Sequence, residues 1–224
     1  MTGSNTQFGW YGKVPCVGDF IRKGLSPQFI SAWDAWMQGI LIDGKEALGD
    51  RWQACYVSAP IWRFALSAGF CGPRPIAGIL MPSVDRVGRQ FPLCLAMEDP
   101  ITEAGATAWT TYQALQPVFP QLEEAALAML DDKAAITDME EALAQLPPLN
   151  VKMQSRVSRL GSATALVTNG LIEQQIPALA TQAPATLWTS AYGGMNRMFF
   201  APEMPQGREL AAGLFDLQAA SWQL

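Results

Sequence analysis

Two short segments, each rich in glycine, proline and charged residues, constrain the fold of this 224-residue chain more than any other feature. The first covers residues 8–22 and precedes a tryptophan-rich stretch, and the second covers residues 81–92. Glycine allows backbone angles that other residues resist, proline fixes its own φ angle, and Asp and Arg side chains hold loops by hydrogen bonds. Because both segments lie between apolar runs, they predict two shaped surface loops next to buried strands.

The N-terminal half alternates between apolar runs and turn residues. Four of the apolar runs are predicted to be strands: residues 8–12, 61–70, 76–81 and 91–97. The last two should form an antiparallel hairpin with a long connecting loop. Residues 13–27 are predicted to be an irregular loop that ends in Ser26-Pro27, a typical helix start. The helix that follows should run to about residue 41 and end at Asp43-Gly44, before a short helical piece that reaches about residue 52.

The C-terminal half begins with a helical region of about residues 104–146, rich in Ala, Leu, Glu and Gln. Thr137 is the predicted cap of its last helix, with Glu140 completing a capping box. Residues 149–162 are predicted to be a polar loop. The remaining predicted elements are strands over 163–167, 185–190 and 195–201 and helices over 171–180 and 207–220.

The order of these elements is strands, then helices, then strands again. It predicts an α/β fold, a three-layer α/β/α sandwich with a mixed, partly antiparallel sheet covered on both faces. The helical region of about 104–146 would be an insertion in a single domain that spans residues 1–224.

The chain contains no histidine, which excludes Ser-His-Asp and Cys-His catalytic sets and His-ligated metal sites. Four cysteines without Cys-x-x-Cys spacing are interpreted as reduced, buried thiols. A formal net charge of -5 argues against nucleic acid as a partner. The polar first residues lack the apolar core of a signal peptide, and no run approaches the ~20 apolar residues that a membrane span needs. We therefore expect a cytoplasmic protein without membrane insertion.

Local patterns that suggest chemistry have plainer interpretations. Gly12-Lys13 invites a phosphate-loop interpretation, but Pro15 removes an N–H group that such a loop would use. Ser83 and Asp85 suggest hydrolysis, but no Ser-x-x-Lys supplies a base, so Ser83 is predicted to be a turn or cap residue. No catalytic residue, metal ligand or cofactor is expected.

The two segments also carry a family resemblance. Residues 9–20 follow the pattern Gly-[Phe/Trp/Tyr]-[Tyr/Phe]-Gly-Lys-x-Pro-x-x-Gly-Asp-Phe, and residues 81–92 follow Met-Pro-Ser-x-Asp-x-x-Gly-Arg-x-Phe-Pro. Together with the tryptophans at 33, 36 and 188, they resemble the TagF/ImpM family, accessory proteins encoded with bacterial type VI secretion systems. The family often has a second tryptophan after Trp188, whereas this chain continues with Thr189.

The resemblance implies a function as well as a fold. It implies the three-layer arrangement and a cytoplasmic, non-enzymatic repressor that acts on assembly of the secretion system after translation. The implied partner is the forkhead-associated (FHA) scaffold protein of that system. Some family members are fused to a PP2C-type phosphatase; this chain has no room for one, so a phosphatase would be a separate partner.

The family motifs supply two groups of candidate residues. The candidates for partner binding are Tyr11, Phe20, Arg22, Ser83, Asp85 and Arg89. The candidates for holding the fold are Gly12, Lys13, Pro15, Gly18, Asp19, Trp33, Pro82, Gly88, Pro92 and Trp188. Charged residues in the two loops could pair within each loop, or Arg89 could pair with Asp19 and join the loops. We take the pairing of Arg89 with Asp19 as the hypothesis to be tested.

Two other functions remain open from the sequence. The chain could be a structural subunit of the secretion apparatus. It could also be a small-molecule-binding, carboxylate-based hydrolase, which would require a deep pocket with two converging carboxylates.

Overall fold

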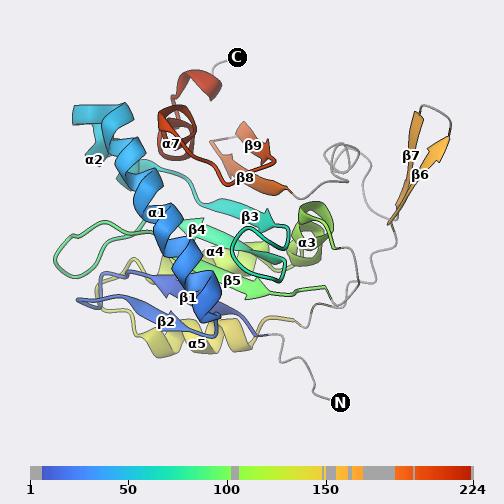
Figure 1. Ribbon diagram of the computed structural model, residues 1–224. Helices are drawn as coiled ribbons and strands as arrows, with labels where there is room; N and C mark the ends of the chain where they lie inside the picture. The colour runs from blue at the N-terminus through green and yellow to red at the C-terminus, as the bar shows by residue number, and fades with distance from the viewer. Residues whose placement is uncertain are drawn as a thin grey trace.

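The computed structural model describes residues 7–101, 106–147, 149, 155–160, 163–168, 185–193 and 195–222. Its main element is a seven-stranded sheet with the order β2-β1-β5-β4-β3-β8-β9 (Figure 1). The strands are β1 (Gly9–Gly12), β2 (Ile21–Lys23), β3 (Trp62–Leu66), β4 (Ile76–Met81), β5 (Leu93–Glu98), β8 (Thr186–Tyr192) and β9 (Met195–Ala201). A separate two-stranded sheet pairs β6 (Ser155–Leu160) with β7 (Ala163–Thr168).

Every strand pairing among the described residues is antiparallel. The presence of both helices and a large sheet confirms the α/β class. The predicted mixed sheet is wrong, because the sheet is antiparallel throughout the described strands. Loops join the neighbours β1–β2, β3–β4, β4–β5 and β8–β9 directly, and such direct connections favour antiparallel pairing. The remaining pairs, β1–β5 and β3–β8, bring together segments that are far apart in the chain.

Helices pack on both faces of the large sheet (Figure 1). One face carries α1 (Pro27–Leu48), α2 (Trp52–Ser58) and α7 (Arg208–Phe215). The other carries α3 (Ala108–Leu115), α4 (Phe119–Ala128) and α5 (Ile136–Ala144). Short 3-10 turns cover Gly49–Arg51 and Ala220–Trp222. Each face has its own cluster of buried apolar side chains, so the central strands β4 and β5 are buried on both sides, as their nearly continuous apolar runs predict.

Helix α1 begins as predicted. The Ser26 hydroxyl accepts a hydrogen bond from the Phe29 amide at 3.2 Å, and Pro27 occupies the first turn. The predicted end at Asp43-Gly44 is wrong, because the helix continues to Leu48. A Cβ atom on Gly44 would lie 2.5 Å from Cζ3 of Trp52. Gly44 is therefore a point of close packing between α1 and the Trp52 ring, and not a helix end.

Other differences from the predicted elements are local. The predicted loop over 13–27 contains β2, and the predicted loop over 149–162 contains β6. Thr137 is not a helix cap: α5 begins one residue earlier, and the Asp138 carboxylate accepts a hydrogen bond from the Ala135 amide at 3.2 Å. The strand predicted over 163–167 is confirmed as β7. The helix predicted over 171–180 lies outside the described residues.

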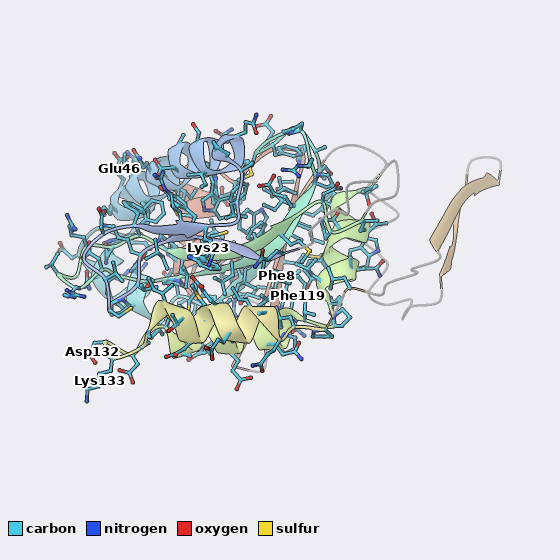
Figure 2. All side chains as sticks on the ribbon, turned by 90° about the horizontal axis from the view of Figure 1, so that it is seen from below. Phe8, Lys23, Glu46, Phe119, Asp132 and Lys133 are labelled. Carbon is cyan, nitrogen blue, oxygen red and sulfur yellow. The ribbon has the colours of Figure 1, made fainter. Side chains whose placement is uncertain are left out.

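The region of α4 and α5 is strongly acidic. Residues 119–144 contain seven Asp or Glu residues and one lysine, Lys133, which Figure 2 shows next to Asp132 near one end of this helical layer. Five of the seven acidic residues are exposed, so they form a solvated helical surface. Among the described residues, no helix is long and apolar enough to cross a membrane.

Candidate functional site

The antiparallel sheet brings the two motif segments together at one of its ends. Strands β1 and β4 both pair antiparallel with β5, which lies between them, so β1 and β4 run in the same direction. The loops that leave their C-terminal ends therefore emerge on the same side of the molecule (Figure 1). We refer to residues 13–22 and 82–90 together as the motif platform.

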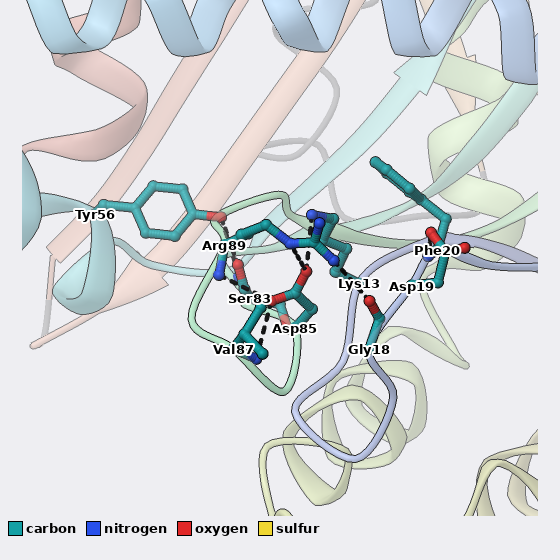
Figure 3. Close-up of polar contacts among 9 residues, drawn as sticks. All are labelled: Lys13, Gly18, Asp19, Phe20, Tyr56, Ser83, Asp85, Val87 and Arg89. Atoms are coloured by element: carbon teal, nitrogen blue, oxygen red, sulfur yellow. Dashed lines mark hydrogen bonds and ion pairs between the residues drawn. The ribbon is translucent and has the colours of Figure 1, made fainter.

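The Asp85 carboxylate lies at the centre of the motif platform, with its side chain fully buried (Figure 3). Its Oδ1 atom accepts hydrogen bonds from the backbone amides of Val87 at 3.1 Å and Arg89 at 2.9 Å. Its Oδ2 atom accepts from Lys13 Nζ at 3.0 Å and from Arg89 Nε at 2.6 Å. Both oxygens are thus occupied by groups of the protein itself.

These contacts determine the ionisation of Asp85. Burial alone would raise the pKa of the carboxyl group, but the hydrogen bonds from Arg89, Lys13 and Val87 outweigh burial and hold the pKa well below the ordinary value of 3.8. A carboxylate that is ionised at neutral pH and fully hydrogen-bonded cannot act as a general acid. Asp85 instead organises the backbone of its loop.

The two loops contact each other directly. Arg89 donates from its guanidinium to the Gly18 carbonyl at 2.6 Å, and the Arg86 backbone amide donates to the Val17 carbonyl at 3.0 Å. The Arg86 guanidinium also donates to the carbonyl of the residue at position 16. The platform is therefore cross-braced by two arginines of the second loop that bind backbone oxygens of the first.

The hypothesis that Arg89 pairs with Asp19 is wrong. Asp19 accepts a hydrogen bond from the amide of its neighbour Phe20 at 2.8 Å. Arg89 pairs with Asp85, four residues earlier in its own loop. Arg89 still joins the two loops, but through the Gly18 carbonyl and not through a second ion pair.

Helix α2 supports the second loop from behind. The buried Tyr56 hydroxyl donates to the Ser83 carbonyl at 2.7 Å and accepts from the Ser83 amide at 3.3 Å. Burial raises the pKa of the Tyr56 phenol, so it remains a donor throughout the neutral range. One turn earlier, Trp52 Nε1 donates to the Gln90 side chain at 2.7 Å. This support was not predicted, although Trp52 and Tyr56 have the four-residue spacing of one helix face.

An aromatic cluster supports the first loop. The Phe20 ring stacks on Tyr11, with ring centroids 5.4 Å apart, and meets the edge of Phe91 at 4.7 Å. Lys13 Nζ lies 4.9 Å from the Phe20 centroid, a cation–π distance. The Tyr11 hydroxyl donates to the Asp34 carboxylate of α1 at 2.6 Å, and burial together with this bond raises the pKa of the phenol.

The six candidates for partner binding divide into two groups by exposure. Tyr11, Ser83 and Asp85 are buried, so their side chains hold the loops and do not face the surface. Phe20, Arg22 and Arg89 are exposed. Two further exposed side chains of the platform were not predicted: Val87, which is 71% exposed, and Arg86. Both lie beside Gly88 at the tip of the loop, the kind of position that could have identified them.

Most candidates for holding the fold lie in or under the platform. Gly12 has a φ angle of 145°, and a Cβ there would lie 2.2 Å from the Pro92 carbonyl oxygen, so glycine is required where β1 meets β5. Gly88 has a φ angle of 82° at the loop tip. Trp33 and Trp188 lie elsewhere, fully buried under α1 with ring centroids 6.1 Å apart. They are core residues and do not belong to the platform.

Cavities among the described residues differ in their charged lining, and one of about 280 Å³ is bordered by Lys23, Glu140 and Glu141. A cavity of about 420 Å³ beside β8 and β9 is lined by Arg63, Tyr112, Thr189, Ser190, Ala191, Asn196, Arg197 and Met198. No carboxylate stands among these lining residues. Within the described part of the chain, no group of three His, Cys, Asp or Glu side chains could hold a metal ion.

The fold and the motif platform are those of a type VI secretion system-associated protein, since residues 9–146 match the family model of the TagF N-terminal domain. The chain belongs to the TagF family, as its two motifs predict. It is also similar to the crystal structure of PA0076 from Pseudomonas aeruginosa PAO1 at 2.05 Å resolution. The two are 30% identical, the match covers 92% of this chain and 93% of that one, and the TM-score is 0.70. No curated protein matches the sequence.

Proposed function

We propose that this TagF-family protein is a non-enzymatic, cytoplasmic regulator that represses assembly of the type VI secretion system after translation. It would act by binding a partner protein, for which the FHA scaffold of that system is our first candidate. The observation that carries the proposal is the motif platform: two family motifs form one cross-braced surface that leaves Phe20, Val87 and three arginines exposed.

The interior of the platform supports binding over catalysis. The Ser83 hydroxyl is buried and has no hydrogen-bond partner among the residues that the structure describes, and the Ser83 amide and carbonyl are both engaged. Asp85 is saturated by internal donors, and the chain has no histidine to activate a nucleophile. A pre-organised surface of this kind loses little conformational entropy on association, which favours stoichiometric docking.

We also infer that this chain folds as a three-layer α/β/α sandwich, which fits the helices on both sheet faces. Such a fold would hold the motif platform rigid at one end of the sheet. Docking of the platform would cover the surface of the FHA scaffold protein that assembly requires. A phosphatase, where one takes part, would be a separate protein.

The proposal is tested by affinity capture from bacterial lysate with this chain as bait, read by mass spectrometry. Arg22→Glu and Val87→Glu should each abolish recovery of the FHA scaffold. Arg208→Glu and Ile42→Glu are the matched controls, because both residues are exposed and lie on α7 and α1, outside the platform. The controls should bind as the wild type does, and circular dichroism should show all four variants folded.

A second readout follows assembly of the secretion apparatus in cells as fluorescent foci of a labelled structural component. Overproduction of the wild type should reduce the number of foci, and the two platform variants should not. Recovery of this chain in fixed stoichiometry with assembled particles would contradict repression and favour a structural subunit instead.

A further inference from the structure

The charge of the motif platform is opposite to that of the chain as a whole. The platform contains four basic and two acidic residues, a formal charge of +2, whereas the whole chain carries -5. Burial makes the contrast sharper at the surface. Asp85 and Lys13 are buried together, which leaves three exposed cations, Arg22, Arg86 and Arg89, against one exposed carboxylate, Asp19.

Apolar side chains accompany these cations. Phe20 is 38% exposed, and Val87 is 71% exposed. Arg22 lies beside Phe20: it is the cross-strand partner of Tyr11, on which the Phe20 ring stacks. The platform therefore presents an aromatic ring and a branched side chain next to guanidinium groups, an arrangement that suits a segment with both acidic and apolar residues.

The arginines are held in a way that argues against a phosphate as the preferred anion. Arg89 is engaged by Asp85 and the Gly18 carbonyl, and Arg86 by backbone oxygens of the first loop. Tight phosphate binding uses several donors that converge on one group. Because Arg86 and Arg89 already use N–H donors on internal oxygens, fewer of their donors are left to converge on one phosphate, whereas the separate carboxylates of a peptide each need fewer donors.

We propose that the motif platform docks an acidic peptide segment of the partner protein, rich in Asp and Glu and containing an aromatic or aliphatic residue. The carboxylates lie against Arg22, Arg86 and Arg89, and the apolar residue covers Phe20 and Val87. This inference rests on the proposed function for the identity of the partner, and it adds the chemistry that the partner must present. The acidic surface of α4 and α5 would repel the same segment and so direct it to the platform.

The test uses labelled peptides of about twelve residues and fluorescence anisotropy. The probe carries several Asp and Glu residues around one Phe and one Leu; its comparison peptides replace the acids by Gln or replace Phe and Leu by Ser. The probe should bind the wild type at low salt and weaken as salt rises from about 50 to 300 mM. Both comparison peptides should bind at least about tenfold more weakly.

Variants locate the binding. The double change Arg22→Glu with Arg86→Glu should weaken binding of the probe about tenfold or more. Val87→Ser, which keeps the hydrogen bond from the backbone amide of residue 87 to Asp85, should weaken it several-fold. Arg208→Glu, at an exposed arginine outside the platform, should leave the affinity unchanged. Thermal unfolding of each variant shows whether the fold is retained.

Equal binding of the acidic and Gln peptides, or unchanged affinity in the double variant, overturns the inference. So does tighter binding of a phosphothreonine peptide or of anionic lipid vesicles than of the acidic probe. If lysate capture recovers the scaffold while the peptide tests fail, the proposed function stands and this inference falls. If the acidic probe binds while no secretion component is recovered, the chemistry stands and the proposed function falls.

Discussion

Replacing Tyr56 by Phe tests whether helix α2 holds the second loop of the platform. The change removes one oxygen atom and keeps the ring, which is 1% exposed and packs against Trp52 and Phe215. Two hydrogen bonds to Ser83 disappear with that oxygen, one to its carbonyl and one from its amide.

The two losses are not equivalent. The Ser83 carbonyl also accepts from the Phe91 amide at 3.1 Å, so it keeps a partner. The Ser83 amide loses its acceptor, and Ser83 is only 4% exposed, so water cannot readily replace the phenol. A buried donor left unpaired costs about 1–3 kcal/mol. With about 2–4 °C of melting temperature per kcal/mol for a chain of this size, we expect Tm to fall by roughly 2–12 °C.

Differential scanning calorimetry measures the fall in Tm, and hydrogen exchange measures the Ser83 amide directly. That amide should exchange faster in Tyr56→Phe than in the wild type. Tyr192→Phe is the control, because Tyr192 is 58% exposed and the loss of its hydroxyl group should change the free energy of unfolding by less than about 0.5 kcal/mol. Unchanged Tm together with unchanged protection of the Ser83 amide would refute the reasoning.

Three further predictions concern acid, helix packing and alkali. Asp85 has a folded pKa below its ordinary 3.8, so the stabilisation that its carboxylate supplies is present above that pH and is lost as pH falls. Between about pH 5 and 2, the free energy of unfolding measured with urea should therefore fall more in the wild type than in Asp85→Asn. Gly44→Ala should lower Tm, whereas Gly39→Ala, in the same helix with open space around it, should add about 0.5–1 kcal/mol to stability; the opposite order would contradict the assigned packing. Tyr11 and Tyr56 have raised folded pKa values, so their stabilisation is complete below pH about 10 and is lost above it. At pH about 11.5 ordinary phenols are almost fully ionised, so phenolate absorbance equivalent to all four tyrosines at that pH, without unfolding, would disprove this.

The sequence identified the two loops of the platform but not their contact. Local patterns place turn residues in each loop, whereas the meeting of the loops depends on β5 lying between β1 and β4, a long-range pairing that local patterns do not encode. Pairing within each loop was one of the two alternatives for Arg89, and the Asp85–Arg89 pair confirms it over the pairing with Asp19. Asp19 and Asp85 are both suitable acids, and a pairing four residues away within one loop closes a shorter segment than one 70 residues away.

Gly44 illustrates a second limit of sequence reasoning. Asp-Gly has low helix propensity, and a helix end is its ordinary interpretation. Here the ring of Trp52 and the edge of Phe215 pack where a Cβ atom would lie, and this tertiary contact outweighs the local preference. At exposed positions, helix propensity determines whether a helix continues or ends. At positions where the helix contacts the core, side-chain packing determines it instead.

The pairing of β3 with β8 has a consequence for the order in which the chain can become structured during synthesis. Residues 9–146, the part that matches the family model, contain five of the seven strands, and β3 would be the last strand of that partial sheet. Its outer edge would present unpaired backbone groups, and the cavity for Trp188 beside Trp33 would stand open. A chain that stops at residue 146 would have a complete motif platform on one side of the sheet and the unpaired edge of β3 on the other. Because such an edge can pair with another chain, we expect this truncated product to aggregate.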